Sequence, residues 1–88
     1  MLFVIQYTIA PEHRNAAQAR FQETGGPPPE GAKMLGRWHR IGGLGGFVLA
    51  ESSNPVAIGK WTQKWSDLLK FEVIPVVNDE EILKVMGS

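Results

Sequence analysis

The sequence contains no cysteine among its 88 residues. This absence excludes disulfide bonds, thiolate metal sites and thiol nucleophiles, because each of them needs a cysteine sulfur. A chain of this length forms one domain and buries only roughly 60–65% of its unfolded surface. A small core without covalent cross-links favours oligomerisation as a further way to bury apolar surface.

The chain also lacks net charge, since it has nine basic and nine acidic residues. A neutral domain offers no positive surface to nucleic acid or to an anionic membrane, so we expect neither as a partner. The N-terminal run Met1–Ile5 has no basic residues and is followed by Gln6. It is too short for a signal peptide or a membrane span, and we therefore expect a cytoplasmic protein.

Apolar and turn-forming segments alternate along the chain. Four segments have the apolar runs or the alternation of β-strands, and they are residues 2–8, 32–41, 46–52 and 71–77. Pro11 favours a helix that begins there and ends near Thr24, before a run of glycines and prolines. Pro55 favours a second helix, and Asn78 can cap a short C-terminal one.

This order of elements predicts a ferredoxin-like βαββαβ fold of the α+β class over residues 1–88, as a single domain. Such a fold has one four-stranded antiparallel sheet with both helices on one face, here with an added short C-terminal helix. Right-handed crossovers give the strand order 4-1-3-2, with the Pro75 strand at an edge. The other face of the sheet is then open. We expect two open faces to pack together in a homodimer, forming a dimeric α/β barrel.

Trp61 and Trp65 are one turn apart on the predicted second helix. Tryptophans at this spacing are more often core residues, because each ring buries a large apolar area. They can also form the wall of an aromatic ligand pocket between helix and sheet, and the two interpretations are compatible if the rings line a cavity. The apolar stripe continues through Leu68 and Leu69, so we expect the helix to reach that far.

His39 lies in a locally basic strand, residues 32–41. Strict alternation places Met34, Gly36 and Trp38 on one face and leaves His39 on the other, although a one-residue change of register would exchange the faces. A histidine here can act as a general base or contact an anionic ligand. The alternative is a residue that faces solvent or the barrel without a chemical role.

Two carboxylates need partners. Glu51 ends the predicted third strand, where it can serve as a base or pair with Arg37 or Arg40, and we favour the ion pair. Asp67 lies near the predicted end of the second helix, where a negative charge is unfavourable. We expect Asp67 to have a local partner, such as an exposed backbone N–H, and a structural role.

The Gly42–Gly46 run connects two predicted strands. Glycine-rich loops bind phosphate where they lead into a helix N-terminus, whereas this loop leads into a strand and matches no nucleotide-binding fingerprint. We interpret it as a hairpin loop. The two histidines are far apart in the sequence and do not have the spacing of metal ligands, so we expect no metal and no cofactor.

Several segments resemble a protein family, the domain of unknown function DUF3303. The resemblance covers most of residues 1–77, and its most specific part is the spacing of Trp61, Trp65, Asp67 and Pro75. Further matching segments are Met1-Leu2-Phe3, Pro29-Glu30-Gly31, Gly36-Arg37-Trp38, Gly46-Phe47, Ala50-Glu51 and Phe71-Glu72-Val73. The resemblance implies a dimeric α/β-barrel fold and brings no activity with it.

Two functional hypotheses follow. The first is a small homodimeric binding or regulatory module for an aromatic small molecule or a protein partner, because no catalytic constellation stands out. The alternative is a cofactor-independent, monooxygenase-like enzyme for an aromatic or quinol substrate, by analogy of fold. A fully packed interior would exclude that enzyme, and a haem-degrading variant would need His39 or His13 as an axial ligand. His39 and Glu51 are the candidate catalytic groups, and the candidate pocket residues are Tyr7, Trp38, His39, Glu51, Trp61 and Trp65.

Overall fold

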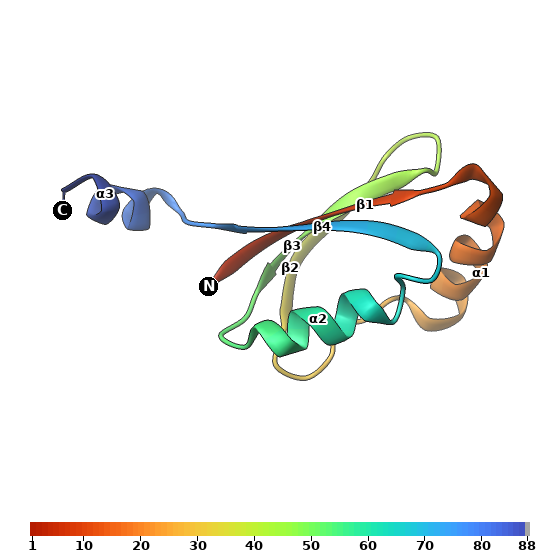
Figure 1. The fold of residues 1–88 in the computed structure, drawn as a ribbon, viewed down its shortest axis with the longest axis horizontal. Helices are drawn as coiled ribbons and strands as arrows, with labels where there is room; N and C mark the ends of the chain where they lie inside the picture. The colour runs from red at the N-terminus through yellow and green to blue at the C-terminus, as the bar shows by residue number, and fades with distance from the viewer. Residues whose placement is uncertain (88) are drawn as a thin grey trace.

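The computed structural model describes residues 1–87, which form one sheet and three α-helices (Figure 1). The strands are β1 (Leu2–Ile9), β2 (Lys33–His39), β3 (Gly45–Glu51) and β4 (Leu69–Val76). Their order is β2-β3-β1-β4, and each neighbouring pair is antiparallel. The predicted ferredoxin-like arrangement is confirmed, with β1 inside the sheet and β4 at an edge.

The helices are α1 (Arg14–Thr24), α2 (Pro55–Gln63) and α3 (Asp79–Gly87), and a 3-10 turn (Pro11–His13) precedes α1. Helix α1 ends at Gly25, whose φ of 74° is left-handed and whose N–H donates to the carbonyl of Phe21 at 2.7 Å. A glycine adopts this conformation without steric cost. No helix in residues 1–87 is long and apolar enough to cross a membrane.

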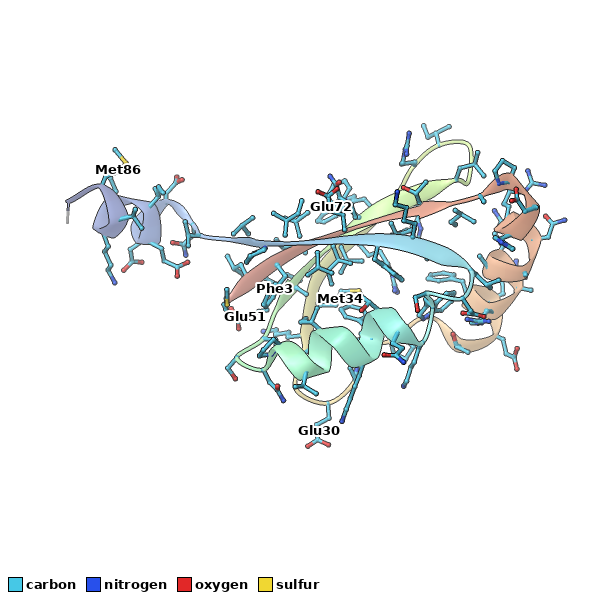
Figure 2. All side chains as sticks on the ribbon, viewed as in Figure 1. Phe3, Glu30, Met34, Glu51, Glu72 and Met86 are labelled. Carbon is cyan, nitrogen blue, oxygen red and sulfur yellow. The ribbon has the colours of Figure 1, made fainter. Side chains whose placement is uncertain are left out.

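The core lies between one face of the sheet and the helices α1 and α2. Alternate residues of β1 point into it and are buried, namely Phe3, Ile5, Tyr7 and Ile9. Ala17 of α1 and Ile58 and Trp61 of α2 belong to the same buried cluster. In Figure 2, Phe3 and Met34 lie between the sheet and α2, whereas Glu72 lies on the opposite side of the sheet.

Strand β2 contains a β-bulge at Leu35. Met34 pairs with Ala50 of β3, and the next paired residue, Gly36, lies opposite Leu49. Leu35 is therefore an extra residue without a partner, and the strand's alternation shifts by one position after it.

This bulge corrects the predicted faces of β2. Met34 packs against the core, but Gly36 and Trp38 lie on the open face of the sheet, as the register with β3 shows. Arg37 and His39 lie on the face that the helices cover. The prediction that Met34, Gly36 and Trp38 share one face is wrong, because strict alternation does not allow for an inserted residue.

Helix α2 is shorter than predicted. It ends at Gln63, and the following turns include a hydrogen bond of 2.9 Å from the Leu69 N–H to the Trp65 carbonyl. Leu69 then pairs with Ile9 as the first residue of β4. The expected helix through Leu69 is therefore wrong, because the ladder with β1 already includes this residue.

The open face of the sheet carries apolar side chains. A half-buried row crosses three strands, with Leu49 and Ile74 on either side of Val4. Near one end of the face, Trp38 and Phe47 stack with ring centroids 5.1 Å apart. Their exposed fractions are 51% and 43%, which is high for large aromatic residues on a sheet.

Candidate functional site

A cavity of about 460 Å³ lies between the sheet and the helices α1 and α2. Volumes in this range accommodate small organic ligands. Aromatic rings from five positions form much of its wall, and these are Tyr7, Phe21, Trp61, Trp65 and Phe71. The interior is thus not fully packed, and the condition that would have excluded the enzyme hypothesis is not met.

Tyr7 and His39 form a polar contact in the wall of this cavity. The Tyr7 hydroxyl lies 2.7 Å from Nδ1 of His39, although β3 runs between their strands. Both residues pair with Gly46 of β3, and a Cβ on Gly46 would overlap the Tyr7 hydroxyl. Gly46 therefore leaves the space through which Tyr7 reaches His39.

The environment of Tyr7 keeps its hydroxyl protonated. Burial raises the pKa of the Tyr7 phenol above its ordinary value, and the charge of Arg37 partly opposes this change. The phenol is therefore neutral at pH 7, and it can donate to Nδ1 of a neutral His39. In that tautomer Nε2 carries the hydrogen and is a donor. In the other tautomer the Nδ1–H donates to the Tyr7 oxygen, and Nε2 is then an acceptor. The pair can thus offer a proton in one tautomer and accept one in the other.

Arg37 lines the cavity and also links β2 to the C-terminal end of α1 by hydrogen bonds. Its Nη1 and Nη2 donate to the carbonyls of Gly26 and Gly25, each at 2.8 Å. Its guanidinium carbon lies 4.9 Å from the centroid of the Phe21 ring, and Phe21 in turn packs edge-on against His39 at 5.3 Å. These contacts place a fixed positive charge in the cavity wall beside Phe21.

The structure brings four of the six predicted pocket residues to this cavity, namely Tyr7, His39, Trp61 and Trp65. The remaining two lie elsewhere. Trp38 is on the open face, where it stacks on Phe47. Glu51 is at the end of β3 away from His39, since it pairs with Lys33 and Leu2.

The expected ion pair of Glu51 with Arg37 or Arg40 is not found among residues 1–87. The Arg37 guanidinium donates to the carbonyls at the end of α1 instead, and Arg37 and Glu51 lie on opposite faces of the sheet. The bulge at Leu35 accounts for this difference, because it moves Arg37 to the helix-covered face.

The sequence reasoning missed the contribution of α1 to the cavity. Gln18, Phe21 and Gln22 line it beside the residues of the sheet. Their spacing of three and four positions puts them on one side of a helix, and this signal was present in the sequence. Phe71 of β4 was also missed, although it pairs directly with Tyr7.

Asp67 has a partner that the sequence did not indicate. Both of its carboxylate oxygens accept from the Arg20 guanidinium at 2.8 Å. Arg20 also donates to the Lys64 carbonyl at 2.9 Å and lies 5.3 Å from the centroid of Trp65. The expected structural role fits these contacts, but the partner is a side chain of α1, 47 positions away, rather than a local backbone N–H.

Among residues 1–87, no three His, Asp or Glu side chains gather where they could hold a metal ion.

Comparisons with known proteins relate the chain to a family. No curated protein matches the chain. The family model described as Domain of unknown function (DUF3303) matches residues 1–88. Trp61 and Trp65, whose spacing is part of the resemblance, line the cavity, and Asp67 accepts a hydrogen bond from Arg20 of α1. Because the family model matches the whole length of the chain, the chain belongs to the DUF3303 family.

Proposed function

We propose that this protein is a small-molecule-binding module whose ligand occupies the cavity between the sheet and the helices. The supporting observation is a cavity of about 460 Å³ with largely aromatic walls, in which Tyr7 and His39 are hydrogen-bonded at 2.7 Å. Apolar walls with few fixed polar groups are the usual composition of small-molecule sites.

The lining residues favour a flat aromatic ligand with a carboxylate or an acidic hydroxyl. Arg37 contributes a positive charge, and no Asp or Glu of the described chain lines the cavity. Nε2 of His39 can donate to an anionic oxygen when Nδ1 accepts from Tyr7. A cation would meet Arg37 without a compensating carboxylate, so anionic and phenolic ligands are favoured over cationic ones.

Calorimetry with three probes of similar size tests this proposal. We expect 2-naphthoate to bind, and we expect decahydro-2-naphthoate and 2-naphthylmethylammonium to bind more weakly. In Tyr7→Phe, the affinity for naphthoate should fall by about 2- to 12-fold, the equivalent of one hydrogen bond of about 0.5–1.5 kcal/mol. Trp38→Phe, on the open face, is the matched control and should bind like the native chain. Equal binding of all three probes, or none, would contradict the proposed ligand class.

The proposal includes a homodimer formed through the open face of the sheet. Its support is the apolar row through Val4 and the exposed stack of Trp38 and Phe47. Replacing Trp38 with lysine should leave the single chain folded, because the ring is already 51% exposed, and should shift sedimentation equilibrium toward monomer. A native chain that is monomeric at micromolar concentration would rule out this assembly, and a protein partner would then be the remaining occupant of the face.

A second candidate function is cofactor-independent oxidation of an aromatic or quinol substrate. The Tyr7–His39 hydrogen bond favours it, because in the tautomer whose Nδ1–H donates to the Tyr7 oxygen, Nε2 of His39 can take a proton from a substrate hydroxyl. Dioxygen would accept two electrons and two protons as the quinol becomes a quinone, with hydrogen peroxide as the second product. An oxygen electrode with a naphthohydroquinone distinguishes the candidates. Consumption above the spontaneous rate that disappears in His39→Gln would indicate an enzyme, and binding without consumption would indicate a binding module.

A further inference from the structure

Helix α3 has a capping signal in its own sequence, but none of its side chains is buried within residues 1–87. Asn78 and Glu81 form a reciprocal capping box, in which the Glu81 N–H donates to Asn78 Oδ1 at 2.9 Å and the Asn78 N–H donates to Glu81 Oε1 at 3.2 Å. The helix has nine residues, none of them buried. A helix of this length is marginal in water even with a good cap, so it needs a partner surface.

The side chains of α3 separate into two faces. At 3.6 residues per turn its apolar residues fall within an arc of about 160°, and they are Ile82, Leu83, Val85 and Met86. Leu83, Val85 and Met86 are each between 63% and 74% exposed. The opposite side of the helix carries Glu80 and Lys84. This is the pattern of a helix that packs on another surface.

The direction of β4 takes α3 away from its own domain. The ladder between β1 and β4 ends at the pair Leu2 and Val76, and α3 begins at Asp79, beyond the end of the sheet. Figure 1 shows α3 projecting along the line of β4, and Figure 2 shows Met86 far from the helices and sheet. The chain measures 48 Å along its longest axis and 17 Å along its shortest.

We propose that α3 is an exchanged arm, whose apolar face packs on the open sheet face of a second copy while the second copy's α3 packs on the first. Both surfaces have apolar side chains that the single chain leaves partly or largely exposed, so a two-fold arrangement covers four surfaces at once. This inference rests on the proposed homodimer but not on a ligand in the cavity.

Charge also favours a second copy as the occupant. The arm, residues 78–88, has three acidic residues and one lysine, a net charge of −2. Because the whole chain has nine basic and nine acidic residues, residues 1–77 carry the balancing charge of +2. An arm that reaches a second copy therefore brings a segment of net charge −2 to a body of net charge +2, which adds to the apolar contact.

Substitution of the apolar face of α3 gives the first test. Leu83→Gln combined with Met86→Gln keeps the charge and uses a good helix former. Both positions are exposed in the single chain, so the fold of each chain should be retained. We expect the dissociation constant of the dimer, from sedimentation equilibrium, to rise at least tenfold, because two apolar contacts are lost on each arm. Glu80→Gln, on the polar side of the same helix, is the control and should dimerise like the native chain.

Cross-linking locates the arm, and the absence of native cysteine makes the products unambiguous. Chains carrying Met86→Cys are mixed with chains carrying a cysteine at Gln6, Phe47 or Glu72 of the open face, and a short bismaleimide is added. We expect mixed cross-linked dimers with at least one of these positions. Chains with Lys60→Cys, exposed on α2, should give none.

Each outcome has a definite meaning. A dimer that survives the double glutamine substitution unchanged, or cross-links only through Lys60→Cys, overturns the exchanged arm and leaves the sheet-face dimer in place. A native monomer overturns both. Naphthoate binding measured on the same samples reports on the cavity separately, so failure of the arm and failure of the ligand site can be told apart.

Discussion

The Tyr7 hydroxyl meets Nδ1 of His39 at 2.7 Å across the full width of strand β3, above Gly46. A side chain larger than hydrogen at Gly46 would occupy the position of the Tyr7 hydroxyl. The polar pair of the cavity therefore depends on a third residue that contributes no side chain. This dependence leads to the first prediction.

We expect Gly46→Ala to destabilise the protein by about 1–3 kcal/mol, the usual cost of overpacking a core. The added methyl overlaps the Tyr7 hydroxyl and the Trp38 carbonyl, so the Tyr7–His39 hydrogen bond should also be lost. Urea unfolding measures the stability, and the ¹⁵N shift of His39 Nδ1 reports the hydrogen bond. An alanine variant as stable as the native chain, with an unchanged shift, would contradict this account of Gly46.

Gly59→Ala should have the opposite effect. Gly59 lies inside α2, and a Cβ there would meet no atom within 4 Å. Alanine favours the helix by up to about 1 kcal/mol over glycine and costs no packing here. We expect a higher urea midpoint at an unchanged slope. A destabilised variant would mean that the exposed side of α2 is covered in the assembled protein.

Ser52→Ala should destabilise the protein by about 1–3 kcal/mol, because it removes the hydrogen-bond partner of partly buried backbone groups. The Ser52 hydroxyl is within 2.6 Å of the Gly31 carbonyl and accepts from the Asn54 N–H at 2.9 Å. It thereby joins the turn before β2 to the start of α2. Thermal unfolding compares it with Ser53→Ala, an exposed neighbour, which should change little.

The ion pair of Arg20 and Asp67 makes stability depend on acid. Hydrogen bonds from Arg20 hold the pKa of the Asp67 carboxyl below its ordinary value. A group with a lowered folded pKa contributes stability above its unfolded pKa of about 3.9, and this contribution is lost as the pH falls through the folded pKa. Between pH 5 and pH 2, Asp67→Asn should therefore lose less stability than the native chain, as measured by urea unfolding. Parallel loss in both proteins would assign the acid sensitivity to other carboxylates.

The topology could be predicted because it depends on the order of elements and the hand of their connections. The apolar character of β1 on both faces indicated its place inside the sheet, and Pro75 indicated an edge. Long-range side-chain pairs were not predictable in this way. Asp67 finds Arg20 only once α1 and the end of α2 are brought together, and nothing near Asp67 in sequence marks that partner.

The candidate site was predicted in part for the same reason. Tyr7, Trp61 and Trp65 were identified because aromatic residues on core-facing positions line whatever space the core leaves. Trp38 was misplaced because an inserted residue at Leu35 leaves no signal in a hydrophobic pattern. The role of Gly46 could not be predicted, because it depends on Tyr7, Gly46 and His39 being paired in one row across three strands.

The bulge at Leu35 gives β2 one residue more than its ladder with β3 uses. Deleting the codon for Leu35 would join Met34 directly to Gly36 and leave every existing pair with β3 in register, so Arg37 and His39 would stay on the helix-covered face. The fold would tolerate the change at the sheet edge, where β2 has a single neighbour. Among descendants of such a gene, the loss of one codon here could thus pass without changing which side chains line the cavity.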